Sequence, residues 1–379
     1  MVITMDSSGN FSKYFLEKLG EKFWIATLIP SLALVIAALI TFDPILRISS
    51  SSVVISGTLT EKIVMAAVLV IIPSLMLGFL LYVAQSYIVR SSSGFGFFQQ
   101  FAFMRNLEIR KANNLLSQVK SLQEEIFKLK KNKRQDNKTR NRIETLRDRY
   151  YTVAAQYDQS FPREFDDILP TRLGNILTAA EDYPRTRYGM NATVFWPRLR
   201  NLLPQETKQA IESSLNELYV LLNFSFLSVI LYIWCIIAVL YSGAALQSVH
   251  VGLSRELVFR SLVESTFRYI FAGSIALFVS WFFYRLALFS ASEFGAQMRS
   301  AFDLHRFLLL QEMRIELPSD SLSEYDLWVN LGEFMVLGEL SVDFLPFHYA
   351  NPQKRKETTA EVPAGRKVPK KRPDSRKQT

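Results

Sequence analysis

The sequence predicts an all-α integral membrane protein with four transmembrane helices and a cytoplasmic helical hairpin between spans 2 and 3. Three observations lead to this fold. Hydrophobic residues, 49% of the 379, are gathered into four long runs, and a helix of about 20 apolar residues crosses a bilayer. Between the second and third runs, apolar side chains recur at helical spacing. Lysine and arginine, which give a net charge of +9, are concentrated in the segments that this topology keeps inside the cell.

The first span is expected at residues 23–42, after a polar cytoplasmic segment of residues 1–22. The apolar run is too long, and too far from the first residue, for a typical cleaved signal peptide. We therefore expect a retained anchor. A short serine-rich loop leads to the second span at residues 63–89, so that residues 23–89 form the first transmembrane hairpin.

Both of these spans contain the tetrapeptide Ile-Pro-Ser-Leu, with its proline at Pro30 and at Pro73. A proline inside a helix removes a backbone donor and kinks the helix. The simpler interpretation is a packing kink, and the sharper one is a hinge or a pore-lining break. The second interpretation makes Pro30, Pro73 and the intramembrane Arg285 candidate gating residues. Because Arg285 lies near the end of its span, we expect it to reach the interface instead.

Residues 90–217 form the predicted cytoplasmic helical domain, and a coiled-coil hairpin is expected at residues 115–157. Its two arms are predicted from apolar residues at three-four spacing in residues 119–129 and 143–157. The segment between the arms, residues 130–142, is strongly basic and has no large apolar residue. It is either a solvated tip or a docking site for an acidic partner. The candidate contacts at this tip are Lys131, Lys133 and Arg134.

The segment of residues 169–204 is the part of the soluble region richest in glycine, proline, aromatic and arginine residues. Within it we expect a short helix from residue 173 to 182, ended before Pro184, and a short strand or membrane-surface contact at residues 194–196. Arginine beside aromatic side chains at a membrane edge binds lipid phosphates, but it also stacks and covers apolar surface. The candidate lipid or partner contacts here are Arg172, Arg185, Arg187, Arg198 and Trp196.

The second transmembrane hairpin is expected at residues 218–288, with spans at 218–241 and 268–288. A cytoplasmic helical region of residues 289–350 follows. Residues 351–379 form a basic tail that is predicted to be disordered and to contact anionic lipid headgroups. With an even number of spans and basic segments inside, both termini are cytoplasmic. The chain is thus predicted to be a multi-pass protein of the cell's inner (plasma) membrane.

The stretch LPTRLGNILTAAEDYPRTRYGMNATVFWPRL resembles a motif in a family of uncharacterised bacterial integral membrane proteins. Residues 85–94 resemble another segment of that family, and so does the region that holds FGAQMRSAFDLHRFLLL and LPSD…LW. The family pattern tends to have a glutamate before a glycine-aromatic pair, and Ser93 stands at that position here. The resemblance implies the architecture and a bacterial origin, and it brings no established activity.

Metal and cofactor chemistry is not expected. The single cysteine, Cys235, excludes an internal disulfide and a cysteine-based zinc site. The three histidines lie far apart, without a paired-ligand spacing. We assign no catalytic residue. An enzyme at the membrane face is the weakest alternative, with these candidates: Glu181, Asp182, Arg185, Arg187 and His305.

The function favoured by these patterns is a non-enzymatic membrane scaffold or signalling component. It would display its helical module to a cytoplasmic protein partner at the hairpin, with the lipid bilayer as its other partner. The alternative is a channel or transporter formed by a homo-oligomer. No Asp or Glu lies within the core of any predicted span, so an ion relay has no obvious carrier. Nucleic acid is not an expected partner, because an anionic membrane surface already accounts for the basic charge.

Overall fold

The computed structural model of the protein describes residues 24–50, 59–96, 101–131, 136–248, 255–338 and 347–349. Within these ranges the regular elements are helices and no strand is present. Ile315 and Tyr349 form an isolated antiparallel β-bridge. The all-α prediction is therefore confirmed. The predicted N-terminal segment and basic tail lie outside the described residues.

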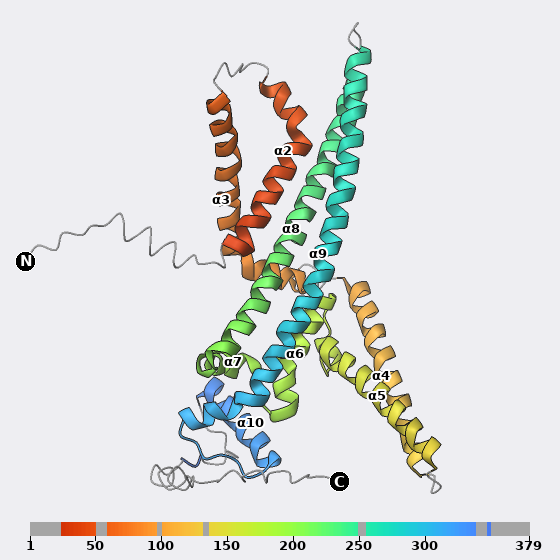
Figure 1. Ribbon diagram of the computed structural model, residues 1–379, viewed down its shortest axis with the longest axis vertical. Helices are drawn as coiled ribbons and strands as arrows, with labels where there is room; N and C mark the ends of the chain where they lie inside the picture. The colour runs from red at the N-terminus through yellow and green to blue at the C-terminus, as the bar shows by residue number, and fades with distance from the viewer. Residues whose placement is uncertain are drawn as a thin grey trace, which may run out of the picture.

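The helices follow one another along an elongated molecule (Figure 1). η1 is a short π-helix and η3 is a 3-10 turn. In chain order the elements are η1 (Trp24–Leu28), α2 (Ile29–Ser50), α3 (Leu59–Ser92), α4 (Ala102–Lys131), α5 (Asn137–Ser160), η3 (Phe165–Asp167), α6 (Arg172–Tyr188), α7 (Ala192–Leu202), α8 (Gln205–Ser248), α9 (Arg255–Glu312) and α10 (Ser321–Leu337).

Within the described residues, three helices are long and apolar enough to cross a membrane. Their candidate spans are Ala67–Ser92 in α3, Gln205–Ser242 in α8 and Val263–Glu312 in α9. Many large apolar side chains on these helices are exposed, Phe278 among them. Such a surface is stable in lipid rather than in water. The predicted first span is represented by a shorter described apolar helix, Ala26–Phe42.

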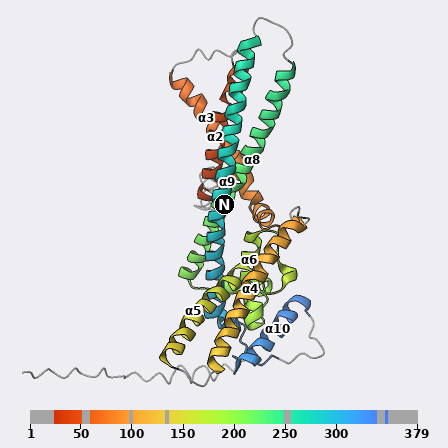
Figure 2. The same ribbon diagram turned by 90° about the vertical axis from the view of Figure 1, so that its right-hand side faces the viewer.

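Two helices form the long axis of the molecule. α8 has 44 residues and α9 has 58, which correspond to lengths of about 66 Å and about 87 Å. Both lengths exceed the hydrocarbon thickness of about 30 Å. α8 and α9 lie side by side in both views (Figures 1 and 2). α6, α7 and α10 pack around one end of this pair, and α2 and α3 lie toward its other end.

Two clusters of buried side chains hold these helices together. The first joins α3, α6, α8 and α9, and includes Ile88, Leu173, Leu222 and Ala287. The second joins α6, α7, α9 and α10 around the fully buried indole of Trp328. α6 and α9 contribute to both clusters, so the apolar helices and the polar end share one continuous core.

α4 and α5 pack side by side and project away from this core (Figures 1 and 2). Ile126, Ile143 and Leu146 form the buried centre of their contact, and all three belong to the predicted apolar seams. Asp136 begins α5 by accepting a hydrogen bond from the Thr139 N–H at 2.9 Å, as N-cap residues do. Lys133 and Arg134, at the predicted tip, lie outside the described residues.

α6 does not end before Pro184, as was expected from the sequence. Pro184 is buried inside the helix, and α6 continues to Tyr188. A proline removes only one backbone donor, and here packing outweighs that loss. The helix ends at Gly189, whose φ of +77° lies in the left-handed region that glycine adopts without steric cost.

Of the two alternatives for residues 194–196, a short strand or a membrane-surface contact, the strand is wrong, because these residues lie inside α7. Asn191 begins this helix, and its Oδ1 accepts a hydrogen bond from the Thr193 N–H at 3.0 Å. Phe195 and Leu199 are fully buried one turn apart. A good N-cap and a helical apolar spacing therefore override the strand propensity of a short β-branched and aromatic stretch.

Candidate functional site

The Leu169–Asn175 motif, LPTRLGN, positions the start of α6 against the end of α3. Thr171 is the N-cap, and its Oγ1 accepts a hydrogen bond from the Gly174 N–H at 3.1 Å. A Cβ at position 174 would lie 2.0 Å from the carbonyl oxygen of Ser93. Only glycine allows the two backbones to approach so closely, so this glycine fixes how α6 packs under the apolar helices.

Asn175 ties the same motif to α4. Its side chain is fully buried and spans its own loop, with Oδ1 accepting from the Leu169 N–H at 2.7 Å and Nδ2 donating to the Leu169 carbonyl at 3.1 Å. Nδ2 also lies 3.5 Å from Oε2 of Glu108, a buried carboxylate that Lys111 pairs with at 2.6 Å. A buried amide with these partners organises a loop, so the motif has a structural role in joining α3, α4 and α6.

Arg185 is surrounded by carboxylates. Its Nε donates to Asp182 Oδ1 at 2.7 Å, and its Nη2 lies 3.4 Å from Glu164 and 3.5 Å from Asp167. Asp182 is buried and also accepts from the Arg163 backbone N–H at 3.2 Å. The charge of Arg185 is thus already paired within the protein, so that Arg185 is poorly suited to bind a lipid phosphate.

A polar cavity of about 400 Å³ lies beside this group, between α5, α6 and α9. It combines two arginines, two carboxylates and one tyrosine. The residues lining it are Ala155, Asp158, Gln159, Tyr183, Arg187, Ala296, Arg299, Ser300, Asp303 and Leu304.

The ring of Tyr183 is in contact with two guanidinium groups. The Cζ of Arg187 lies 5.4 Å from the ring centroid, and the Cζ of Arg299 lies 5.9 Å from it. Arg187 also lies 3.8 Å from Asp158. Arg299 is only 8% exposed, and its Nη2 is buried without a hydrogen-bond partner among the residues that the structure describes. The two cations of the cavity are matched by two carboxylates. Arg299 is held by the Tyr183 ring and by a hydrogen bond from its Nη1 to the Asp158 carbonyl at 3.3 Å.

Asp303 on α9 accepts hydrogen bonds from two tyrosines of α6. The Tyr183 hydroxyl lies 3.1 Å from Oδ2, and the Tyr188 hydroxyl lies 2.6 Å from Oδ1. Burial first, and Asp303 second, raise the pKa of both tyrosine hydroxyls above the ordinary value. Both hydroxyls are therefore held as neutral donors to the carboxylate.

Arg306 extends this network to α10. Its guanidinium lies over the Tyr188 ring, 4.1 Å from the centroid, and its Nε lies 2.5 Å from Glu324 Oε1. The Trp328 indole N–H lies 3.4 Å from the same oxygen. α6, α9 and α10 are thus joined by charged and aromatic side chains above the buried Trp328 core, and this arrangement stabilises one relative placement of the three helices.

The predicted site residues are spread over different elements. Arg198 is exposed and donates to the Val194 carbonyl of its own helix. Trp196 packs 5.8 Å from the Phe302 ring, and Lys131 is exposed at the end of α4. Arg172 is half-buried in the first turn of α6. Of the five predicted arginines and aromatics in this segment, Arg187 alone lines the polar cavity.

The enzyme candidates do not form one group. Asp182 pairs with Arg185, whereas Glu181 is exposed, and the half-buried His305 does not line the polar cavity. Among the described residues, no group of three His, Cys, Asp or Glu side chains is close enough to hold a metal ion.

The three candidate gating residues are also separate. Pro30 is buried, Pro73 is exposed on α3, and Arg285 is exposed and lies 5.6 Å from the Trp281 ring centroid. A buried polar contact elsewhere in the apolar bundle involves Asn223, which the sequence places near the inner end of the third span as a packing residue. The Asn223 Nδ2 donates to the Ala26 carbonyl at 2.7 Å and to Gln85 Oε1 at 3.0 Å.

The fold and these contacts define a helical protein with apolar helices of membrane-spanning length. No family model, curated protein or solved structure matches the chain.

Proposed function

We propose that this chain is a multi-pass membrane scaffold or signalling component, without enzymatic activity, that displays a helical module to a cytoplasmic protein partner. In this proposal η1 and α2 form a fourth span beside α3, α8 and α9. Together they cover Trp24–Ser50, which is longer than the roughly 20 residues that a span needs. Four spans bring both termini to the cytoplasmic side, in agreement with the basic charge of the segments there.

The observation that carries this proposal is the continuity of α9. One uninterrupted helix supplies Ala287 and Ala291 to the cluster under the apolar helices, and Phe302 and Leu309 to the cluster around Trp328. A tilt or rotation of α9 in the bilayer must therefore move the helices packed on its far end. Such an arrangement suits a component that holds, or transmits a change to, a module at the membrane surface.

The α4–α5 pair is the part of this module best placed to meet a partner. Phe127 on α4 is 68% exposed, and it stands among Lys120, Glu124 and Lys128. The last turn of α4 is basic. An exposed aromatic side chain with two lysines beside it, close to the basic end of α4, fits a protein surface that is apolar with acidic margins.

Photo-crosslinking in cells tests this function. A photoreactive amino acid at position 127 should capture one protein of defined mass, and the same residue at Leu322, exposed on α10, should not capture it. Reversing the charge in Lys128→Glu should weaken the capture, because it places like charges together. Capture of the same proteins from both positions, or of none from position 127, would contradict the proposal.

The topology is tested separately by cysteine labelling in a Cys235→Ser background. A cysteine at Lys131 or at Leu322 should react only with a reagent that enters the cell. A cysteine at His250, between the predicted spans at 218–241 and 268–288, should lie outside the cell and react with an impermeant reagent. Labelling of position 131 from outside would reverse the proposed orientation.

An oligomeric channel is the second candidate, and one observation favours it. Gln85 Nε2 and Asn223 Oδ1 are buried among the apolar helices and have no hydrogen-bond partner within the described part of the chain. Such a donor and acceptor would suit water in a pore. Light scattering of the protein in mild detergent tests this candidate, since a closed ring of four or more copies is expected for a channel and a monomer or dimer for a scaffold.

A further inference from the structure

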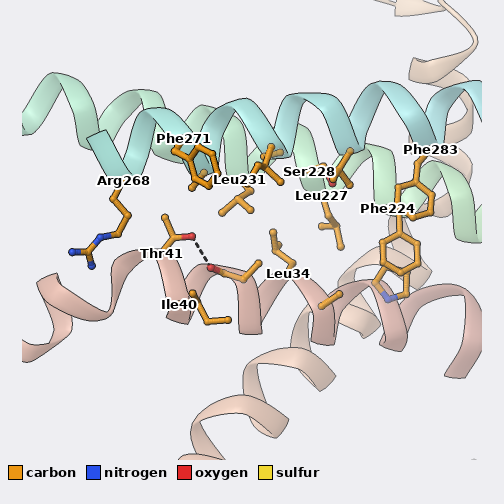
Figure 3. A pocket seen from close by; sticks show the side chains of 17 residues that line it. Leu34, Ile40, Thr41, Phe224, Leu227, Ser228, Leu231, Arg268, Phe271 and Phe283 are labelled. Atoms are coloured by element: carbon orange, nitrogen blue, oxygen red, sulfur yellow. Dashed lines mark hydrogen bonds between the residues drawn. The ribbon is translucent and has the colours of Figure 1, made fainter. Parts of the chain in front are cut away.

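A groove of about 470 Å³ lies between α2 on one side and α8 and α9 on the other, within the apolar part of the molecule (Figure 3). Its walls are almost entirely aliphatic and aromatic, with Leu34, Leu231 and Phe271 among the lining side chains. Thr41 adds no unsatisfied polar group, because its hydroxyl donates to the Ala37 carbonyl at 2.8 Å. The groove is therefore suited to a hydrocarbon chain.

One end of the groove is closed by aromatic side chains. The rings of Phe224 and Phe283 stack with centroids 4.7 Å apart and an interplanar angle of 13°. Figure 3 shows this pair at the end opposite to Arg268. The positions of Arg268 and Phe283 on α9 are separated by about 22 Å along the helix axis. The groove thus extends over much of the hydrocarbon thickness of about 30 Å.

The other end of the groove carries a positive charge. Arg268 is the one charged side chain among the described residues that line it. Its nearest acidic partner is Glu264, at 3.8 Å, whose side chain is 74% exposed. An ion pair of this length and exposure is weak. The guanidinium of Arg268 is therefore available to an anion at the mouth of an apolar groove.

A second apolar cavity offers a comparison. It has a volume of about 710 Å³, lies on another face of α2, and includes Ala38, Pro73 and Tyr241 in its lining. No charged side chain is found among its described lining residues. Both cavities are apolar, but only the groove has a cation, Arg268, among its described lining residues. The groove therefore matches an anionic ligand, and the second cavity does not.

We propose that the groove holds one acyl chain of an anionic phospholipid, with the phosphate of its headgroup paired to Arg268. Guanidinium–phosphate pairing is a strong charge-assisted interaction, and it is strengthened where water is scarce. Transfer of an acyl chain from the surrounding bilayer into the groove gives no hydrophobic gain by itself, because the lipid tails of the bilayer are as apolar as the groove. The acyl chain should therefore fix the position, and the selectivity should come from the net charge of the headgroup. A zwitterionic lipid carries a cation next to its phosphate, and this cation is repelled by Arg268, whereas an anionic lipid has none.

Native mass spectrometry of the full-length protein in mild detergent tests this site, with phosphatidylglycerol as the anionic probe and phosphatidylcholine as the zwitterionic one. One phosphatidylglycerol should remain bound per chain, with an affinity about tenfold above that of phosphatidylcholine. Arg268→Gln should abolish this preference. The matched control is Arg260→Gln, since Arg260 is an exposed arginine on the same helix that does not line the groove, and it should keep the preference.

Two further variants test the acyl chain. Ala33 lines the groove with an exposed side chain, so Ala33→Phe should fill it without a clash and lower the binding of phosphatidylglycerol about tenfold. Ala38→Phe, which fills the uncharged cavity, should leave that binding unchanged. Equal binding of the two lipids to the wild type, or a lack of effect of both Arg268→Gln and Ala33→Phe, would overturn the proposal.

Discussion

Gly174 in α6 faces the carbonyl oxygen of Ser93 so closely that a Cβ at position 174 would lie 2.0 Å from that oxygen. The obstacle is backbone, which cannot rotate away as a side chain does. We predict that Gly174→Ala lowers the free energy of unfolding by about 3 kcal/mol, measured by denaturation in mixed micelles. The matched control is Gly332→Ala in α10, where the added methyl would lie 3.5 Å from the Phe195 ring and should be neutral or stabilising. Equal stability of Gly174→Ala and the wild type would contradict this close approach.

Asp303 should control the ionisation of Tyr183 and Tyr188. Asp303→Asn removes the negative charge from both hydrogen bonds and should lower the free energy of unfolding near neutral pH by about 1–2 kcal/mol. The raised tyrosine pKa means that the unfolded chain loses these protons first as pH increases above 10. The associated stability is therefore complete below pH 10 and is lost above it.

The measurement for Asp303 is the free energy of unfolding from pH 8 to pH 11.5. The wild-type value should fall more steeply with pH than the value of Asp303→Asn, since the variant's tyrosines have a pKa nearer to the ordinary 10.0. Asp326→Asn on α10 is the control, because Asp326 is exposed. Identical slopes in all three proteins would show that Asp303 does not govern the two hydroxyls.

The paired α4 and α5 could be predicted from the sequence, whereas the Asp303 network could not. The arms have a regular apolar spacing, and Ile126, Ile143 and Leu146 are buried as that spacing requires. Asp303 and Tyr183 lie 120 residues apart, and no local pattern connects them. Their contact depends on how α6 crosses α9, which is set by tertiary packing.

The errors in the central segment have a common cause. The proline at position 184 and the Val-Phe-Trp stretch at 194–196 are local signals against a helix. Both were overridden by burial and by the caps at Gly189 and Asn191. The glycine of LPTRLGN is visible in the sequence, but the backbone that requires it, at Ser93, is not.

Asp320 should make the start of α10 sensitive to acid. It is the N-cap, and hydrogen bonds first from the backbone and hydroxyl of Ser323, and then from Ser319, lower its pKa from 3.8 to about 2. The stability that it contributes is therefore present above pH 3.8 and is lost as pH falls toward 2. The protection of the Leu322 and Ser323 amides, meaning their exchange rate relative to the intrinsic rate of an unfolded chain at the same pH, should fall over this window. In Asp320→Ala the exchange should be faster at neutral pH and lose this acid dependence, whereas an unchanged profile would contradict the capping role.

Variants of the buried amides Asn223 and Gln85 distinguish the scaffold proposal from the channel proposal. Asn223→Leu leaves the Ala26 carbonyl and Gln85 Oε1 without their donor, and should cost about 1–3 kcal/mol in the free energy of unfolding. Adding Gln85→Leu should recover much of that loss, because a pair replaced on both sides leaves fewer unpaired polar atoms. This recovery is expected if the pair only joins η1, α3 and α8.

If the pair lines a conducting path, the double variant should instead change ion flux in liposomes, and such a change would favour the channel. Asn201→Leu, at an exposed position on α7, is the control that should alter neither stability nor flux.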